Sequence, residues 1–295
     1  MRGKGVWLAF VAVAAVMASS QAAAQGRALT FITIDFPGSV LTNVQGINAS
    51  GDIVGFYNDA NGRAHGFVRS GGVFRSIDVP GSVTTQARGI SPAGDIVGSY
   101  QRPGESGGIP VHGFLMTLSG SFREVDYPGH LNTIPQRILP DGTILGCYHD
   151  ENTMDTMHGM LRSRRGFDAI EEAMSMHNGA TPDGRFIVGI FTDMDNRGKG
   201  YTVDGGRFTP FEVPGAASTA AWDVNPSRVI VGVFQDSAGA FHGFSYDGQA
   251  FGRVDVPGAR ATRIFGINEG GDMVGAFVDD AGRTHGFLAQ WTPTR

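Results

Sequence analysis

Histidines recur along this chain in a fixed context, and histidine is the side chain best suited to acid–base chemistry or metal binding near neutral pH. Five of them precede a glycine, which an aromatic residue follows in all but one: His65, His112, His158, His242 and His285. Their regular spacing puts them at equivalent points of successive structural units, so we expect them to lie too far apart to share one metal ion. We predict that each imidazole bonds a turn of its own unit, with Asp59, Asp236 and Asp279 as partners.

A second repeated set consists of carboxylates, each followed by one residue and then Pro-Gly: Asp35, Asp78, Asp126, Glu212 and Asp255. Two carboxyl groups that cooperate in glycoside hydrolysis must lie within about 5–10 Å of each other. The spacing of the repeats separates these acids as it separates the histidines. We therefore predict that they cap turns, and we assign no catalytic residue.

Two further segments contain metal-binding residue types. The segment that begins at Asp193 looks like the start of a calcium loop, but Arg197 and Asp204 stand where an oxygen ligand and a glutamate are needed, so we predict a polar hairpin. Residues 147–177 concentrate ligands that suit copper(I): Cys147, His149, Met154, Met157, His158, Met160, Met174, Met176 and His177. Because methionine also fills irregular cores, we predict no bound metal and no cofactor, and we keep copper(I) as the alternative.

The elements that must position these residues are six repeats of roughly 40–50 residues. A typical repeat combines a strand ending in Pro-Gly, a threonine, a Gly-Ile-Asn phrase or a variant of it, an Ile-Val-Gly strand and the histidine phrase. The fourth repeat lacks the Pro-Gly, the threonine at its usual position and the histidine of the phrase. Four short strands per repeat, separated by turn signals, are typical of a propeller blade. The chain has 45 glycines in 295 residues, and its apolar runs are nearly continuous, as in sheets covered on both faces. We predict an all-β, six-bladed β-propeller with about four short antiparallel strands per blade.

The two ends of the chain supply complementary parts of one repeat. Residues 31–35 form an outer-strand phrase with no blade before them, and the last repeat reaches Trp291 with no outer-strand phrase after it. We predict that the N-terminal strand closes the last blade, which hides two open sheet edges. An open array of the same units is the alternative.

These phrases resemble the HAF repeats, a family of extracellular bacterial repeats named for a His-Ala-Phe motif. The similarity covers roughly residues 28–291 and rests on Ile-Asp-x-Pro-Gly, Gly-Ile-Asn, Gly-Asp-Ile-Val-Gly and the histidine phrase, in which glycine replaces the family's alanine. The fourth unit departs most, since Lys199-Gly200-Tyr201 stands in place of His-Gly-Phe. The resemblance implies an exported repeat protein and brings no catalytic residue.

The N-terminal segment differs in composition from the rest. A basic start and the apolar run Val6–Ala18 are followed by small residues at 22–24, which predicts a signal peptide at residues 1–24 and a single propeller domain at residues 25–295. The apolar run is short for a bilayer span, so we expect no membrane span after signal removal. We predict a secreted or periplasmic protein. Cys147 is the only cysteine, so no intramolecular disulfide can form.

The formal net charge is −5, and it becomes more negative when Arg2 and Lys4 are removed with the signal. An acidic chain argues against nucleic acid as a partner. The partner classes that remain are a small molecule, a glycan or a surface protein, and we expect a monomer.

One position varies between repeats while its surroundings stay constant. It lies two residues before the repeated Ile or Val, on the strand expected to be innermost, and contains Gln45, Arg88, Gln136, Asn178 (or His177), Trp222 and Phe265. Positions that face a central channel are free of blade-packing constraints, and a mixed polar, cationic and aromatic set suits a ligand pocket. We predict these six residues as ligand-binding candidates. The alternative is that they only fill the channel.

The function that the sequence favours is a secreted, non-catalytic repeat propeller that acts as a binding or scaffold protein, for carbohydrate or a surface partner. The alternative is a secreted propeller hydrolase or lyase with its site at one mouth of the channel. A purely structural protein is the third candidate. Fold alone does not separate them, because propellers host many activities.

Overall fold

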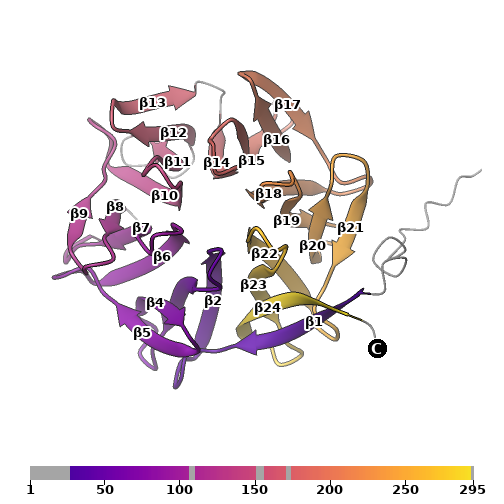
Figure 1. Ribbon diagram of the computed structural model, residues 1–295, viewed down its shortest axis with the longest axis horizontal. Coiled ribbons are helices and arrows are strands. Elements are labelled where there is room, and N and C mark those ends of the chain that lie inside the picture. The colour runs from indigo at the N-terminus through magenta and orange to yellow at the C-terminus, as the bar shows by residue number, and fades with distance from the viewer. Residues whose placement is uncertain (1–26, 106–109, 151–155, 171–173, 294–295) are drawn as a thin grey trace, which may run out of the picture.

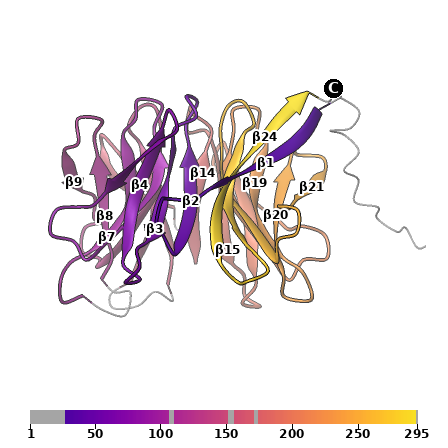
Figure 2. The same cartoon turned by 90° about the horizontal axis from the view of Figure 1, so that it is seen from below.

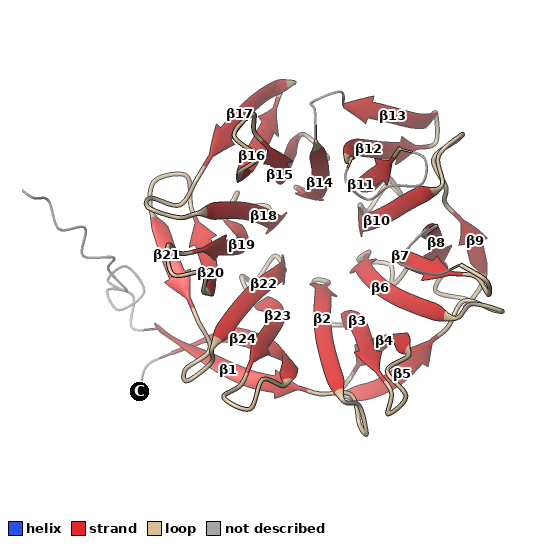
Figure 3. Ribbon diagram, turned by 180° about the vertical axis from the view of Figure 1, so that it is seen from behind, coloured by secondary structure: helices blue, strands red, loops and turns tan. Residues whose placement is uncertain are grey.

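The repeats fold into six four-stranded antiparallel sheets, which stand side by side in a ring (Figure 1), and the strand that opens each repeat is the outer strand of the preceding sheet. The computed structural model describes residues 27–105, 110–150, 156–170 and 174–293. All regular secondary structure in these residues is β-strand, as Figure 3 shows. The predicted six-bladed propeller is therefore confirmed. The described part of the chain includes no helix that could cross a lipid bilayer, and the predicted signal peptide lies outside the described residues.

Every blade begins with the strand nearest the ring axis and ends with the outermost strand. Blades 1 to 3 consist of β2 (Leu41–Ile47), β3 (Ile53–Asn58), β4 (Ala64–Ser70) and β5 (Val73–Ile77); β6 (Thr84–Ile90), β7 (Ile96–Gln101), β8 (His112–Met116) and β9 (Phe122–Glu124); and β10 (Asn132–Ile138), β11 (Ile144–His149), β12 (His158–Ser163) and β13 (Gly166–Ile170). Blades 4 to 6 consist of β14 (Ser175–Ala180), β15 (Phe186–Thr192), β16 (Gly198–Asp204) and β17 (Arg207–Phe211); β18 (Ser218–Val224), β19 (Ile230–Gln235), β20 (Phe241–Tyr246) and β21 (Phe251–Val254); and β22 (Ala261–Ile267), β23 (Met273–Val278), β24 (Thr284–Pro293) and β1 (Arg27–Ile34).

The hydrophobic core lies between neighbouring blades. In one cluster Val54 and Ile77 of blade 1 pack with Ala87, Ile96 and Phe114 of blade 2, all of them buried. Both faces of most sheets are covered in this way, which explains why the apolar runs of the sequence are continuous rather than alternating. No blade can bury its own apolar faces, so each depends on its neighbours.

A buried threonine stabilises the turn between successive blades at five of the six connections. The Oγ1 atom of Thr42 accepts a hydrogen bond of 2.9 Å from the backbone N–H of Phe36, which opens the Pro-Gly turn. The same hydrogen bond, donated by the backbone N–H six residues earlier in the chain, is accepted by Thr85, Thr133, Thr219 and Thr262. The threonine thereby provides a hydrogen-bond acceptor for a backbone N–H that lies beyond the end of the outer strand and has no partner in the sheet.

The glycine of the histidine phrase allows adjacent blades to approach closely. A Cβ atom added at Gly113 would lie 2.2 Å from the carbonyl oxygen of Val125 and 2.9 Å from the Pro135 ring in the next blade. An alanine at this position would therefore displace the inner strand of blade 3. The glycine at this position therefore has a packing reason in this chain.

Strand β1 closes the ring by completing the blade that the other end of the chain begins. It pairs antiparallel with β24 from Arg27 opposite Pro293 to Ile34 opposite Gly286, and Figure 2 shows the two strands running together. The Ile34 side chain is 3% exposed. The Arg283 guanidinium adds a 2.9 Å hydrogen bond to the carbonyl oxygen of Ser39. The predicted closure is confirmed.

Deleting residues 27–36 from the full chain will expose the edge of β24 and remove the buried Ile34 side chain. We expect a fall in thermal midpoint of at least about 10 °C, since a loss of several kcal/mol acts on a domain for which each kcal/mol shifts the midpoint by about 2–4 °C. Differential scanning calorimetry measures it.

A matched pair on the same strand controls for nonspecific effects of changing β1. Ile34→Ala is expected to cost about 2–5 kcal/mol because Ile34 is buried, whereas Ile32→Ala, at a residue 43% exposed, should cost far less. An unchanged midpoint after the deletion would rule out ring closure by β1.

Candidate functional site

Four of the five repeated histidines, His65, His112, His242 and His285, are each held between two acidic side chains of their own blade. His158 contacts one acid among the described residues, Asp150, at 3.2 Å. His285 contacts Asp35 through Nδ1 at 2.8 Å and Asp279 through Nε2 at 3.2 Å. The same arrangement joins His242 to Asp255 at 2.9 Å and to Asp236 at 3.2 Å. His65 likewise contacts Asp78 at 2.8 Å and Asp59 at 3.6 Å. The prediction that Asp59, Asp236 and Asp279 are the histidine partners is confirmed.

The acids before Pro-Gly also belong to these contacts, which the sequence analysis did not foresee. It assigned them to turn capping, whereas Asp78, Asp126, Asp255 and Asp35 all accept from or pair with a histidine Nδ1. Their role is to tie the outermost connection to the third strand of the blade. The common spacing of 13 or 14 residues between most of these partners was the available signal.

Blade 4 makes the same connection with different residues. Lys199 stands in place of the histidine, and its Nζ lies 3.0 Å from Asp193 and 3.9 Å from Glu212. Asp193 Oδ1 also accepts the backbone N–H groups of Asp195 and Arg197 at 3.0 and 2.9 Å. This confirms a polar hairpin at the segment that looks like a calcium loop. Lys199 in blade 4 thus occupies the place between two acids that histidine occupies in blades 1, 2, 5 and 6.

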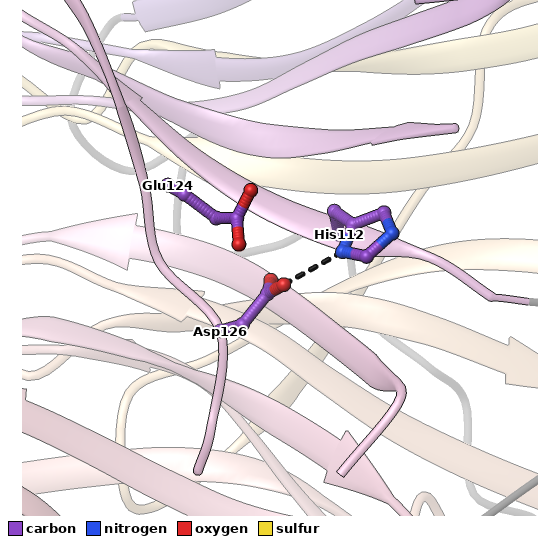
Figure 4. Close-up of side chains that lie close together, drawn as sticks. All are labelled: His112, Glu124 and Asp126. Atoms are coloured by element: carbon purple, nitrogen blue, oxygen red, sulfur yellow. Dashed lines mark hydrogen bonds and ion pairs between the residues drawn. The ribbon is translucent and has the colours of Figure 1, made fainter. Parts of the chain in front are cut away.

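Blade 2 has an additional carboxylate beside its histidine (Figure 4). His112 contacts Asp126 at 2.6 Å and Glu105 at 3.0 Å, and ligand atoms of His112, Glu124 and Asp126 all lie within 4.8 Å of one another. Glu124, however, is bonded to the Arg102 guanidinium and to the Tyr100 hydroxyl. A metal ion bound here would have to displace the Arg102 guanidinium from Glu124 and the proton in the hydrogen bond between His112 and Asp126. The cluster of His112, Glu124 and Asp126 is better explained as the histidine–acid contact of the other blades with one additional carboxylate.

The soft ligands of residues 147–177 are distributed over several packing environments. Met160 is fully buried in the blade core, and Met176 accepts a 3.4 Å hydrogen bond from the Gln136 amide. His177 bonds the Tyr201 hydroxyl, and burial lowers its pKa to about 4. Cys147 lies 3.5 Å from His149, while Met154 lies outside the described residues. The described atoms therefore show ordinary packing roles for these side chains.

The six predicted ligand-binding positions share one structural feature, a β-bulge on the inner strand. In every blade the pairing of the inner strand with its neighbour skips one residue, and the skipped residues are Gln45, Arg88, Gln136, Asn178, Trp222 and Phe265. This settles the choice left open in blade 4, because Asn178 occupies the bulge and His177 packs between blades. A bulge redirects side chains away from the regular ladder.

Solvent reaches only part of this ring. Arg88 and Trp222 are partly exposed, whereas Gln45, Gln136, Asn178 and Phe265 are 4%, 2%, 0% and 7% exposed. Two positions before each bulge, most side chains are partly exposed as well. We call the partly exposed residues at these two levels the axial surface: Asn43, Gln86, Arg88, Met176, Ala220, Trp222 and Arg263.

A buried ion pair closes the axis below this surface. The Nε atom of Arg137 on β10 lies 3.2 Å from Oδ2 of Asp223 on β18, although blade 4 stands between their blades. Arg137 also donates to the carbonyl oxygens of Arg88, Gln136 and Phe265. Asp223 accepts the backbone N–H groups of Ile267 and Val224 at 3.1 and 3.0 Å. The pair thereby bridges blades 2, 3, 5 and 6.

The sequence analysis missed Arg137 and Asp223, although a signal was present. Both occupy the position directly after the bulge, which is glycine in the other blades: Gly46, Gly89, Gly179 and Gly266. An added Cβ at Gly89 would lie 2.6 Å from the carbonyl oxygen of Gln136 in the next blade. Two opposite charges that replace glycine in a ring of glycines indicate a contact across the axis.

The axial surface opens on the side where the inner strands begin. Beyond the ion pair the next ring of residues is buried, including Ile47 at 8%, Val224 at 3% and Ile267 at 6% exposure. A hollow of about 950 Å³ lies at the other ends of these strands, among the turns of blades 4 and 5. Its charged lining is paired, since Arg228 lies 2.7 Å from Asp204. The axial surface is the stronger candidate site because it contains a cation that has no acidic partner in the part of the chain that the structure describes.

Arg88 is that cation. Its Nη2 donates to Gln86 at 2.8 Å and its Nε to the Ser99 hydroxyl at 3.3 Å. Burial lowers its pKa to about 10, with a smaller contribution from the nearby Arg137. Across the axis, the Trp222 ring lies edge-to-face against Phe265, with centroids 5.0 Å apart. The surface thus combines a guanidinium, side-chain amides and an aromatic ring.

Breaking the central ion pair will be costly. Asp223→Asn leaves the Arg137 charge buried without a carboxylate, and we expect a loss of about 3–5 kcal/mol in the free energy of unfolding. Urea denaturation measures it. The double variant Arg137→Gly/Asp223→Gly, which restores the glycine ring, should lose less than the sum of the two single glycine variants. Additive losses would show that the two charges do not depend on each other.

The histidine contacts predict a pH-dependent contribution to stability. Burial by itself lowers the pKa of His285, but hydrogen bonds to Asp35 and Asp279 outweigh it and leave the pKa raised. The stabilisation is therefore full below the ordinary histidine pKa of 6.5 and is lost as pH rises through the raised value. The stabilisation is also lost in acid. The pKa of Asp279 is lowered in the folded protein, so the contribution of this carboxylate is fully present above its ordinary value of 3.8 and disappears as the pH falls below that value.

The difference in unfolding free energy between the native protein and His285→Gln should accordingly be largest at mildly acidic pH and decline toward pH 8. Urea titrations from pH 4 to pH 8 test this, with Arg123→Gln on the exposed outer strand of blade 2 as a control. A difference that grows with rising pH would contradict the assignment.

Comparison with known proteins supports the fold. A scan against protein families finds no match, and no curated protein matches the sequence. Solved structures do match. The fucose-specific lectin of Aleuria aurantia is 12% identical, with a TM-score of 0.53 over 89% of this chain and 98% of the lectin. TolB from Acinetobacter baumannii is 14% identical, with a TM-score of 0.55 over 81% of this chain and 63% of TolB. The β-propeller domain of the Trilobed protease from Pyrococcus furiosus is 9% identical, with a TM-score of 0.54 over 87% and 96% of the two chains. At these identities the likeness shows that the chain shares the propeller fold.

Proposed function

We propose that this protein is an exported, non-catalytic propeller that binds carbohydrate on the axial surface. The observation that carries the proposal is that Trp222, packed edge-to-face against Phe265, and Arg88, with its amide neighbours, are partly exposed on the inner strands of opposite blades. Sugars offer apolar C–H faces, which stack on aromatic rings, and hydroxyl groups, which bond amides and guanidinium groups. The axial surface provides both kinds of contact.

The polar side chains of the axial surface are held in fixed positions. Gln45 donates to Asn43 Oδ1 at 2.6 Å, and Gln86 accepts from Arg88 at 2.8 Å. These bonds leave other amide donors and acceptors free to serve a ligand. Because the residues stand on strands rather than on loops, binding costs little ordering of the protein.

The hydrolase or lyase alternative is less well supported. Acid–base cleavage of a glycoside needs two cooperating carboxyl groups. In the described part of the inner strands the acid beside the axial surface is Asp223, which Arg137 and two backbone N–H groups hold in place. An acid engaged in this way is poorly placed to exchange a proton with a substrate.

Export and the class of ligand rest on separate support. The basic start and apolar run of the N-terminus favour a secreted or periplasmic protein, as does the resemblance to HAF repeats. A fucose-specific lectin has the same fold, so a propeller of this kind is compatible with sugar binding. We further propose that the protein acts as a monomer.

Replacing Trp222 tests the proposal. On a glycan array the native protein should bind a defined subset of glycans, and Trp222→Ala should weaken the best of these at least about tenfold, because truncating an aromatic residue that dominates an interface costs about 2 kcal/mol or more. Trp222→Phe should retain part of the affinity. Leu118→Ala, at a residue 73% exposed away from the axis, is the control. Absence of glycan binding by the native protein would overturn the proposal.

A further inference from the structure

The charge of the axial surface is opposite to that of the chain as a whole. The formal net charge of the chain is −5. Around the axis, however, the described inner strands place Arg88, Arg137 and Arg263 against a single carboxylate, Asp223. Asp223 is committed to Arg137. Two guanidinium groups of an acidic protein therefore remain at the axis without a carboxylate partner among the described residues.

Both of these arginines are partly removed from water. Burial lowers the pKa of Arg88 to about 10 and also lowers the pKa of Arg263, whose guanidinium lies 4.1 Å from the centroid of the Phe241 ring. Burial of a cation costs free energy unless it is compensated by an opposite charge or by several hydrogen bonds. Arg88 makes two hydrogen bonds with neutral partners, so several of its five N–H donors remain for another acceptor.

The architecture of the blades does not require a cation at this position. The equivalent bulge residues in blades 1, 3 and 4 are neutral amides, namely Gln45, Gln136 and Asn178. Each of them fits the same bulge and bonds a neighbour, as Asn178 does with the carbonyl oxygen of Ala221 at 2.8 Å. The bulge by itself therefore does not explain why blade 2 has an arginine at this position.

We propose that the axial surface selects acidic carbohydrates, with Arg88 binding the carboxylate of a uronic-acid-type sugar. The inference rests on the proposed carbohydrate function and names the chemical class of its ligand. A guanidinium binds a carboxylate through two parallel hydrogen bonds, which provides orientation as well as affinity. Trp222, opposite Arg88, supplies the stacking surface for a sugar ring, and Arg263 adds to the positive field.

The test compares ligands that differ only in charge. Binding of the full purified protein to trigalacturonic acid, its fully methyl-esterified form and a neutral galactose trisaccharide is measured by isothermal titration calorimetry. We expect the acid to bind at least about tenfold more tightly than the ester or the neutral sugar. Its affinity should also fall as salt is raised from 50 to 500 mM, because screening weakens charge attraction.

Variants then locate the charge recognition. Arg88→Gln should remove the preference for the acid over its methyl ester, and Arg88→Lys should restore part of the preference. Arg123→Gln, which makes the same charge change on β9, should have no effect. A thermal melt of each variant confirms folding, and the ligand comparison on the native protein does not depend on any variant.

The outcomes separate this inference from the proposed function. Equal affinity for acid, ester and neutral sugar would overturn the charge selectivity and leave carbohydrate binding intact. Binding to none of the three, together with no glycan bound on the array, would overturn both. A preference for the acid that survives Arg88→Gln would refute the assignment to Arg88.

Discussion

The pairing of β1 with β24 is the constraint on which the rest of this structure depends. Each blade covers its apolar faces with its neighbours, so the ring has no stable end unless the sixth blade is completed. The strand that completes it comes from the other end of the chain. Asp35, which follows β1, contacts His285 at 2.8 Å, so closure also completes the histidine contact of that blade. A single strand pairing therefore fixes the edge, the core and the electrostatics of blade 6 together.

Closure of the ring in turn fixes the positions of the side chains around its axis. Six inner strands face one another, each with a bulge at the same level, and side chains from blades that are distant in sequence come within contact of one guanidinium. Arg137 bonds residues of blades 2, 5 and 6 as well as its own. The charge on this side chain is tolerated because four carbonyl or carboxylate groups surround it. Arg88 lacks such a surrounding, and this contrast gives the axial surface its chemical character.

Repetition made most of the architecture predictable. The Pro-Gly turns and the buried threonines each occur in five repeats and the Ile-Val-Gly strand, with small variations, in all six, so an error in one repeat is corrected by the others. The histidines could be assigned to their blades because equivalent positions in a ring cannot converge. Blade 4 shows the strength of this argument, since Lys199 and Glu212 preserve the cation-and-acid contact after the histidine phrase has changed.

The sequence by itself determined the number of blades, their strand content, the closing strand and the positions that escape the repeat, because all of these follow from local propensity and periodicity. Only the tertiary structure decided which of those positions solvent reaches. Arg88 and Trp222 are accessible while Gln136 and Asn178 are buried, and no local pattern distinguishes them. The pairing of Arg137 with Asp223 was decided there as well. Its partners are separated by a whole blade, and the distance across a closed ring does not depend on separation along the chain.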